Sequence, residues 1–338
     1  MASHSQETQR RIVGKPRVIV TRHLLPSVEA RMEELFDCSL NRSDTPMSRE
    51  ELIAAMQDCD ILVPTVTDTI DGEMIDKAGD RLRLIANFGA GTDHLDLKAC
   101  AARRIMVTNT PGVFTDDTAD IAMEMIIGVP RRVREGVALV RRGEWTGWAP
   151  SHLLGRKLGG KVLGIVGMGR IGQAVAHRAK AFGLEIVYHN RKPLPEAVER
   201  MFAARYVADL DELLAEADIV SLHCPHTEHT HNLIDARRFA LMKDGVSLIN
   251  TARGELIDID ALVDALEVGK LAGAGLDVYP HEPHVDARLL EFPNVMTLPH
   301  IGSATMEGRE ASGEKIIANI RFWIDGHRPP DQVLDALV

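Results

Sequence analysis

Short apolar runs alternate with longer amphipathic stretches from residue 16 onward. A short apolar run indicates a buried strand, and apolar residues three and four apart indicate a helix with one buried face. Ser48, with Glu51 three residues later, is typical of a helix start. In this first series the pattern predicts strands Arg17–Thr21, Ile61–Pro64, Leu82–Phe88 and Ile105–Thr108, and helices Pro26–Phe36, Ser48–Asp58, Gly72–Ala78 and Leu95–Arg103.

A second series of the same kind begins at Lys161. A long helical region, Asp116–Arg142, separates the two series, and Pro130 is expected to kink it. The second series predicts strands Val162–Val166, Glu185–His189, Ile219–His223, Val246–Asn250, Gly273–Asp277 and Val295–Leu298. Its predicted helices are Gln173–Phe182, Pro195–Met201, Leu210–Ala217, Ala236–Met242 and Asp260–Val268.

The alternation of strands and helices predicts an α/β protein with two Rossmann-like, doubly wound parallel-sheet domains and a cleft between them. The terminal helix, about Ala304–Ile324, has no strand after it, so we expect it to cross back to the first domain. The predicted domains are therefore residues 16–112 with 303–338, which form a discontinuous domain, and residues 113–302. Residues 1–15 are polar and are predicted to be a mobile leader.

Composition narrows the class of protein. The 338 residues include 45% hydrophobic side chains, enough for sizeable cores. The net charge of −10 argues against a nucleic-acid or anionic-membrane partner, although local arginines can still bind a small anion. The four cysteines form no C-x-x-C pair, and no signal peptide or membrane-spanning apolar run appears. These features favour a cytoplasmic protein.

Three glycines follow the first strand of the second series, in the spacing G-x-G-x-x-G. Gly167 suits a tight turn, Gly169 lets a backbone approach a pyrophosphate, and Gly172 lets the helix pack close to the strand. The helix that follows offers free N–H groups to the phosphates. We therefore predict a dinucleotide site, with a packing turn as the alternative.

The next strand of that series ends at His189 and is followed by Asn190, Arg191 and Lys192. An acidic residue near this position binds the ribose 2′-OH of NAD, whereas an arginine accommodates a 2′-phosphate. No carboxylate stands here, and two cations do. The sequence therefore favours NADPH over NADH, and the alternative is a solvated basic turn.

Three further residues suit the chemistry of a carboxylate substrate. Arg253 follows a predicted strand, in a position where a guanidinium can bind a carboxylate. His300 follows the last predicted strand, and a carboxylate such as Glu282 can fix the tautomer of an imidazole and favour its charged form. The spacing of these residues does not by itself bring them together.

With these motifs the chain resembles the D-isomer-specific 2-hydroxyacid dehydrogenase family over nearly its whole length. The resemblance rests on residues 87–93 (NFGAGTD), the GMGRIG loop, residues 251–254 (TARG), the Glu282-Pro283 pair and residues 299–305 (PHIGSAT). It implies that residues 16–112 with 303–338 bind the substrate and that residues 113–302 bind the dinucleotide.

The same resemblance implies roles for individual residues. Arg253 would bind the carboxylate and polarise the carbonyl, and His300 would be the general acid–base, oriented by Glu282. The backbone N–H groups of Ala90 and Gly91 would complete the carboxylate site. The implied cofactor-binding residues are Thr118, Gly167, Met168, Gly169, Arg170, Ile171, Gly172, Asn190, Arg191, Lys192, Cys224, Pro225, Thr251, Ala252, Asp277 and Gly302.

Within that family, the segment from Trp145 through Trp148 to Gly155 resembles the glyoxylate/hydroxypyruvate reductase branch. This implies reduction of glyoxylate to glycolate and of hydroxypyruvate to D-glycerate with NADPH, in a homodimer. Two alternatives stay open: a broader 2-oxoacid reductase for longer chains, and a cofactor-sensing protein that resembles a corepressor. A further hypothesis is that Trp145 or Trp148 reaches the active site of a partner subunit; the alternative is that both anchor the long helix.

The run from His223 to His231 contains four histidines and Cys224, which is a possible zinc-binding composition. The family uses this loop to line the cofactor, and hydride transfer here needs no metal. We therefore expect no metal site.

Overall fold

The computed structural model describes residues 14–334, which form two compact units. One unit takes in the chain up to Phe114 and again from Thr305, and the other is Thr115–Ala304. The sequence places the corresponding boundaries at 112/113 and 302/303. The expected mobile leader, residues 1–15, lies outside the described residues except for its last two positions. No helix within the described residues is long and apolar enough to cross a membrane.

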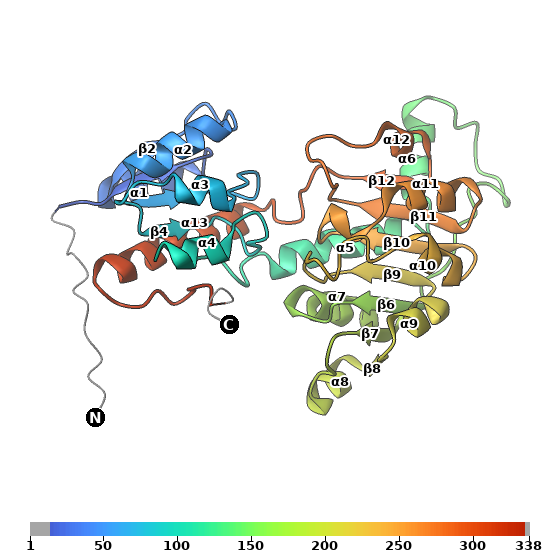
Figure 1. Cartoon of the computed structure of the whole chain (residues 1–338). Helices are drawn as coiled ribbons and strands as arrows, with labels where there is room; N and C mark the ends of the chain where they lie inside the picture. Colours follow the sequence, from blue (N-terminus) through green and yellow to red (C-terminus); the bar gives the residue numbers. More distant parts are fainter. Residues whose placement is uncertain (1–13, 335–338) are drawn as a thin grey trace. The chain divides into compact units, whose positions relative to one another are not determined.

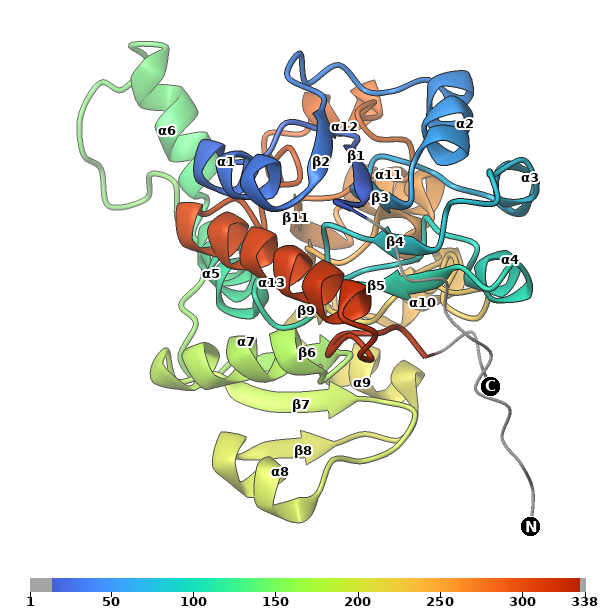
Figure 2. The same cartoon turned by 90° about the vertical axis from the view of Figure 1, so that its left-hand side faces the viewer.

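The first unit (Figure 1) is built on a five-stranded parallel sheet, and its strands lie in the order β2-β1-β3-β4-β5 (Figure 2). Four of its strands are largely buried: β1 (Arg17–Val20), β3 (Ile61–Val63), β4 (Leu84–Ala86) and β5 (Met106–Thr108). The sequence pattern missed the edge strand β2 (Asp37–Leu40), because its residues are half-buried and exposed in turn and it has no apolar run. This order places β1 and β3 at the centre, where the direction of winding reverses.

Helices cover both faces of this sheet. On one face α1 (Pro26–Leu35) and α13 (Met306–Ile324) lie side by side (Figure 2) and share a core with β1, β3 and β4. On the other face are α2 (Arg49–Asp58), α3 (Gly72–Asp76) and α4 (Leu97–Ala102). The predicted start of α2 is confirmed: Ser48 Oγ accepts from the Glu51 N–H at 3.2 Å, and the Glu51 carboxylate accepts from the Ser48 N–H at 2.7 Å.

The end of the described chain pairs with the free edge of β5. The N–H of Asn109 donates to the carbonyl of Asp331, and the N–H of Val333 donates to the carbonyl of Val107. Lys315 and Asn319 on α13 both bond the Asp331 carboxylate, at 2.9 and 3.2 Å. Residues 331–333, from the end of the described chain, therefore cover the edge of a sheet whose strands come from the beginning of the chain.

The second unit is a seven-stranded parallel sheet in the order β12-β11-β10-β9-β6-β7-β8. The chain starts at the interior strand β6, adds β7 and β8 on one side, and then returns to add β9 to β12 on the other, which is the doubly wound dinucleotide-binding order. The strands are β6 (Val162–Val166), β7 (Glu185–His189), β8 (Ala204–Tyr206), β9 (Ile219–Leu222), β10 (Val246–Asn250), β11 (Leu271–Leu276) and β12 (Val295–Thr297). Short β8 has no apolar run, and the sequence pattern missed it.

Two buried clusters hold helices to the two faces of this sheet. One contains α5 (Thr115–Gly128) and α7 (Arg170–Ala181), and the other contains α9 (Leu210–Glu216), α10 (Ala236–Leu241) and α11 (Ile259–Glu267). Two short helices, α8 (Glu196–Phe202) and α12 (Ala287–Glu291), and the 3₁₀ turn η1 (Gly254–Leu256) complete the unit.

The predicted helical region Asp116–Arg142 consists of two separate helices, where the sequence predicted one helix kinked at Pro130. The helix α5 ends at Gly128, and a separate helix, α6 (Val133–Arg141), begins after Arg132, whose φ is +56°. Pro130 has no N–H to donate and its ring clashes with the preceding turn, so it ends the helix instead of only bending it. The change of direction leaves every residue of α6 at least partly exposed.

Candidate functional site

The glycine loop connects β6 to α7. Two of its glycines are closely packed against backbone atoms, and one borders open space. A Cβ added to Gly167 would lie 2.5 Å from the backbone N of Cys224, and one added to Gly172 would lie 2.4 Å from the carbonyl O of Gly167. A Cβ added to Gly169 would meet nothing within 4 Å. Gly167 and Gly172 therefore allow the turn and the helix packing. Gly169 leaves open space above the backbone, as a pyrophosphate requires.

The helix α7 begins at Arg170, earlier than the predicted Gln173, so Arg170 and Ile171 belong to its first turn. Its N-cap residue is Gly169, and no side chain caps the helix there. The N–H groups of this first turn have no partner within the helix, so they are suited to an anion.

The residues after β7 lie against the same loop. The N–H of Met168 donates to Asn190 Oδ1 at 2.7 Å, and the Tyr206 hydroxyl donates to the Asn190 carbonyl at 3.1 Å. Asn190 is therefore fixed beside the glycine loop. Arg191 and Lys192 are exposed and form no ion pair within residues 14–334.

Two buried polar atoms at the carboxyl ends of β9 and β10 have no hydrogen-bond partner in the described part of the chain: His223 Nδ1 and Thr251 Oγ1. Burial lowers the pKa of His223 to about 4, so its ring is neutral at pH 7, and Nε2 lies 2.8 Å from Ser221 Oγ. Burial also raises the pKa of the neighbouring Cys224 thiol to about 11. Unpaired polar atoms beside an open glycine loop fit a bound polar ligand such as a dinucleotide.

The turn that carries Arg253 is organised by Asn250, the last residue of β10. Asn250 is fully buried; its Nδ2 donates to the carbonyl of Arg253 at 2.7 Å, and its Oδ1 accepts from the N–H of Ala252 at 3.0 Å. The guanidinium of Arg253 donates to the Ala252 carbonyl at 2.6 Å. The arginine is thus held at the carboxyl end of the sheet, half-buried.

His300 and Glu282 form a hydrogen-bonded pair. His300 Nδ1 lies 2.7 Å from Glu282 Oε2, and the other carboxylate oxygen accepts from the Tyr279 N–H at 3.0 Å. Burial raises the pKa of Glu282, but the hydrogen bond and charge of His300, with a contribution from the charge of Arg253, outweigh burial and hold this pKa below its usual value. The ionised Glu282 fixes His300 with a proton on Nδ1, which leaves Nε2 for other chemistry.

Asp277 holds the backbone on the other side of His300. Its two carboxylate oxygens accept from the N–H groups of Ile301 and Gly302 at 2.8 and 2.7 Å. Burial raises the pKa of Asp277, and these two N–H bonds oppose the rise. His300 itself has a φ of +56°, a backbone conformation that needs such support in a residue other than glycine. A Cβ added to Gly302 would lie 3.4 Å from Thr118 Cγ2, so Thr118 adjoins this loop.

The second unit thus brings Arg253, Glu282 and His300 to the carboxyl edge of one sheet, together with the cofactor candidates. Ala90 and Gly91 follow β4 in the first unit, in a partly exposed loop. Sequence reasoning missed three residues that organise these loops: Asn250, Tyr279 and Asn87. Asn87 stands in the quoted motif of residues 87–93 and Asn250 ends a predicted strand, but nothing in the sequence showed which atoms they bond.

The histidine run forms no metal cluster. Within residues 14–334 no group of three or more His, Cys, Asp or Glu side chains is arranged to hold a metal ion. His226 Nε2 lies 3.2 Å from His231 Nδ1, and both rings are at the surface.

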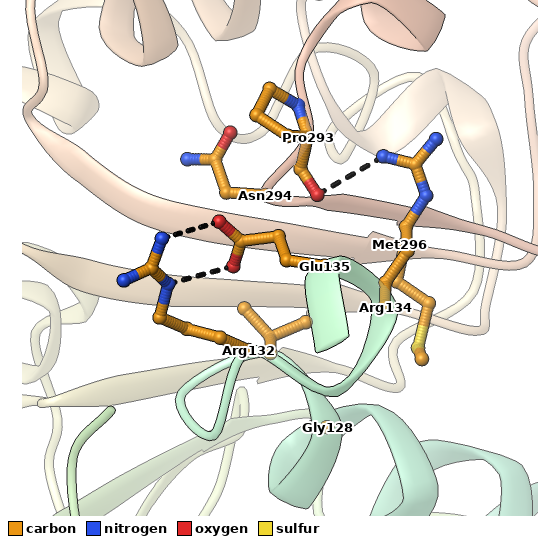
Figure 3. Close-up of a pocket in the computed structure, with 8 residues that line it drawn as sticks. Gly128, Arg132, Arg134, Glu135, Pro293, Asn294 and Met296 are labelled. Carbon is orange, nitrogen blue, oxygen red and sulfur yellow. Dashed lines mark hydrogen bonds and ion pairs between the residues drawn. The ribbon is translucent and has the colours of Figure 1, made fainter. Parts of the chain in front are cut away.

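Two hollows lie beside α6. The smaller, drawn in Figure 3, has a volume of about 10 Å³, roughly the space of one water molecule. Its walls include the Arg132–Glu135 ion pair and Arg134, which donates to the carbonyl of Phe292. The larger has a volume of about 400 Å³ and is lined by α6, Leu153 and residues 290–293. These residues precede β12, at the opposite end of that strand from His300.

Comparisons with known proteins agree on one family. Residues 123–302 match the model described as D-isomer specific 2-hydroxyacid dehydrogenase, NAD binding domain. A glyoxylate reductase of Thermococcus litoralis is 43% identical over 323 residues, covering 94% of this chain and 97% of the relative.

Solved structures of similar proteins include a glyoxylate reductase from Paecilomyes thermophila, with a TM-score of 0.85, 35% identity and coverage of 95% of this chain and 99% of that one. Another is an NADPH-dependent glyoxylate/hydroxypyruvate reductase from Sinorhizobium meliloti in complex with NADP and malonate, with a TM-score of 0.84 and 32% identity. The alignment covers 96% of this chain and 98% of that one.

The lowered pKa of Glu282 predicts a pH-dependent contribution to stability. Because the folded protein favours the ionised form, the contribution is fully present above the ordinary value of 4.5 and is lost as the pH falls through the lowered folded value. We expect the unaltered protein to be more stable than Glu282→Gln at pH 6, with the difference shrinking below about pH 4.5. Urea unfolding between pH 3 and pH 6 measures this. The same series on Glu267→Gln, at the exposed end of α11, controls for loss of a negative charge; a pH-independent difference for Glu282→Gln contradicts the assignment.

Proposed function

Because the chain belongs to the D-isomer-specific 2-hydroxyacid dehydrogenase family, we propose that it reduces small 2-oxoacids with NADPH, converting glyoxylate to glycolate and hydroxypyruvate to D-glycerate. It is an oxidoreductase with a nicotinamide-binding domain. The observation that carries the proposal is the His300–Glu282 pair at 2.7 Å, with the charge of Arg253 acting on the same carboxylate.

Each residue of this group has a separate task. The guanidinium of Arg253 binds the substrate carboxylate and polarises the carbonyl oxygen. His300 donates a proton to that oxygen, and Glu282 stabilises the charged imidazole and fixes its orientation. The N–H groups of Ala90 and Gly91 take part in carboxylate binding, and Asp277 keeps the loop that carries His300 in place.

The cofactor supplies the hydride. The proposal assigns its pyrophosphate to Gly167, Met168, Gly169, Arg170, Ile171 and Gly172, with Thr118 also near the phosphates. Asn190, Arg191 and Lys192 receive the phosphorylated ribose, Cys224 and Pro225 border the adenosine, and Thr251, Ala252, Asp277 and Gly302 border the nicotinamide side. The open space above Gly169 and the unpartnered Thr251 Oγ1 support this assignment.

Arg191 and Lys192 carry the preference for NADPH over NADH. Both are exposed beside Asn190, whose side chain is already bonded to the glycine loop. A ribose 2′-phosphate can therefore pair with two cations that have no other ion pair in residues 14–334. The four free cysteines support a cytoplasmic location.

The proposal includes a homodimer that forms through α6 and the segment after it. The exposed apolar side chains of this surface are Val133, Val137 and Val140 on α6, and Trp145, Trp148 and Leu154 beyond it. Val133, Val137 and Val140 are spaced along one face of the helix, and Trp148 is 83% exposed. An apolar surface of this kind, next to a hollow of about 400 Å³, suits a self-complementary contact.

The activity is tested by following NADPH oxidation with glyoxylate, hydroxypyruvate, pyruvate and phenylpyruvate. We expect turnover with the first two, and His300→Ala to lower kcat roughly 10²–10⁴-fold, because it removes the general acid. His327→Ala, which changes an exposed histidine after α13, should keep normal turnover. Near-normal kcat in His300→Ala excludes it as the proton donor. Turnover that favours phenylpyruvate supports the broader reductase, and NADPH binding without any turnover supports the cofactor-sensing alternative.

The cofactor preference predicts a selective effect of Arg191→Ala combined with Lys192→Ala. Charge-assisted hydrogen bonds contribute about 1.5–3 kcal/mol each, so we expect KM for NADPH to rise at least tenfold. KM for NADH should change less than about twofold, since NADH has no 2′-phosphate. Arg200→Ala, which removes an exposed arginine from α8, is the control. An equal rise for both cofactors refutes the assignment.

The homodimer predicts a molecular mass of twice the chain mass in sedimentation equilibrium at micromolar concentration. Val137→Glu combined with Trp148→Glu should shift the protein to monomer, because it places charges in the buried apolar contact. Phe182→Glu, which changes an exposed apolar residue at the end of α7, should leave the mass unchanged. A monomeric unaltered protein, or a dimer that survives the double substitution, overturns this interface.

A further inference from the structure

The loop after β4 has an uneven distribution of hydrogen bonds. Within residues 89–91 of this loop, the carbonyls of Gly89, Ala90 and Gly91 all accept hydrogen bonds from the protein. Gly89 accepts from Asn87 Nδ2 at 3.1 Å and from the Thr110 N–H at 3.0 Å. Ala90 accepts from Asn109 Nδ2 at 2.7 Å, and Gly91 accepts from Asn87 Nδ2 at 2.9 Å.

The N–H groups of the same loop are used differently. The N–H of Gly89 donates to the Asn87 carbonyl at 3.1 Å, but those of Ala90 and Gly91 donate to no acceptor in residues 14–334. Two successive N–H groups with no protein acceptor are available to bind an anion. Because the carbonyls of residues 89–91 are already hydrogen-bonded, these residues offer a ligand the N–H groups of Ala90 and Gly91.

Asn87 is the centre of this arrangement. Its side chain is fully buried at the end of β4, and both of its amide hydrogens are needed for the two carbonyls it bonds. Its Oδ1 lies 2.9 Å from His94 Nε2, and an amide oxygen can only accept, so His94 donates there. The orientation of the amide is therefore fixed from both ends, and with it the positions of Gly89 and Gly91.

We propose that Asn87 and Asn109 are positioning residues for substrate binding: they hold the carbonyls of residues 89–91 so that the N–H groups of Ala90 and Gly91 face the substrate carboxylate. The inference rests on the proposed function, because it takes the ligand to be a 2-oxoacid. Neither asparagine contacts the reacting atoms. Their loss should therefore weaken carboxylate binding and leave dinucleotide binding unchanged.

The chain contains a matched control. Asn41, after β2, also donates Nδ2 to two carbonyls, those of Thr21 at 2.8 Å and Thr45 at 2.7 Å, and its Oδ1 accepts from Ser43 Oγ at 2.9 Å. It belongs to the same sheet, but β1 and β3 separate β2 from β4. Asn41→Ala therefore removes the same kinds of bond from the same unit, at a half-buried position, without touching residues 89–91.

The test compares Asn87→Ala, Asn109→Ala and Asn41→Ala in the full-length protein. The first measurement is KM for glyoxylate with kcat. The second is the rise in melting temperature caused by oxamate, an unreactive 2-oxoacid analogue, in the presence of NADPH. We expect Asn87→Ala to raise KM roughly tenfold or more and to abolish the oxamate effect, with kcat at saturation changed much less. Asn109→Ala, which loses one bond, should have a smaller effect of the same kind.

Further measurements separate positioning from loss of fold. NADPH affinity from fluorescence titration should stay within about twofold of the unaltered protein in every variant, and Asn87→Ser, whose hydroxyl still donates one bond, should recover part of the lost affinity. The inference is overturned if Asn87→Ala has unchanged KM for glyoxylate and an unchanged response to oxamate. It is also overturned if Asn41→Ala loses as much substrate and oxamate binding as Asn87→Ala. If Asn87→Ala does not fold, Asn109→Ala decides by the same criteria.

The oxamate measurement also separates this inference from the proposed function. If the unaltered protein reduces no 2-oxoacid but binds oxamate in an Asn87-dependent way, the activity is wrong and the positioning role stands. If the unaltered protein shows no response to oxamate, the loop is not a carboxylate site and the positioning role fails.

Discussion

Parallel strand pairing is the constraint on which the functional architecture depends. In a parallel sheet every strand ends at the same edge, so residues that follow different strands meet there although they are far apart in sequence. In the second unit this one rule gathers the glycine loop after β6, the basic turn after β7, the buried imidazole after β9, and the arginine, aspartate and histidine segments after β10, β11 and β12. The order of the strands in the sheet is enough to bring these loops together, without a separate long-range contact for each residue.

Both units then use a buried side-chain amide to shape a loop at that edge. Asn87 at the end of β4 and Asn250 at the end of β10 are fully buried, and each bonds backbone groups two to four residues further on. An asparagine has donors and an acceptor on one short, rigid side chain, so it can fix a turn that has no regular backbone bonding of its own. One such turn carries Arg253, and the other presents N–H groups. Asp277 does the same with a carboxylate for the loop that carries His300.

The sequence was sufficient for the fold class and for the strands with apolar runs, because burial on both faces of a parallel sheet leaves a continuous hydrophobic signal. It was insufficient for β2 and β8, which are half-exposed edge strands, and for the break between α5 and α6, where Pro130 ends the helix instead of bending it. The motifs were sufficient to single out Arg253, Glu282 and His300 as candidate site residues, and the structure brings all three to one edge of the second sheet. The pairing of His300 with Glu282 was expected only from the family resemblance, and the two carbonyls that Asn87 bonds were not expected at all, because hydrogen-bond partners depend on backbone positions that residue spacing does not determine.

The placement of α13 in the first unit affects the order in which the two units can fold during synthesis. A ribosome releases all of the second unit before it releases Met306–Ile324, so the apolar surface formed by Val28, Met32 and their neighbours has no helix over it during that interval. The second unit can complete its own sheet first, since domains generally fold as units during synthesis. The first unit, although its first residues are made earliest, becomes complete last. The second unit, which carries the glycine loop, can therefore reach its final form while one face of the first unit's sheet still lacks α13.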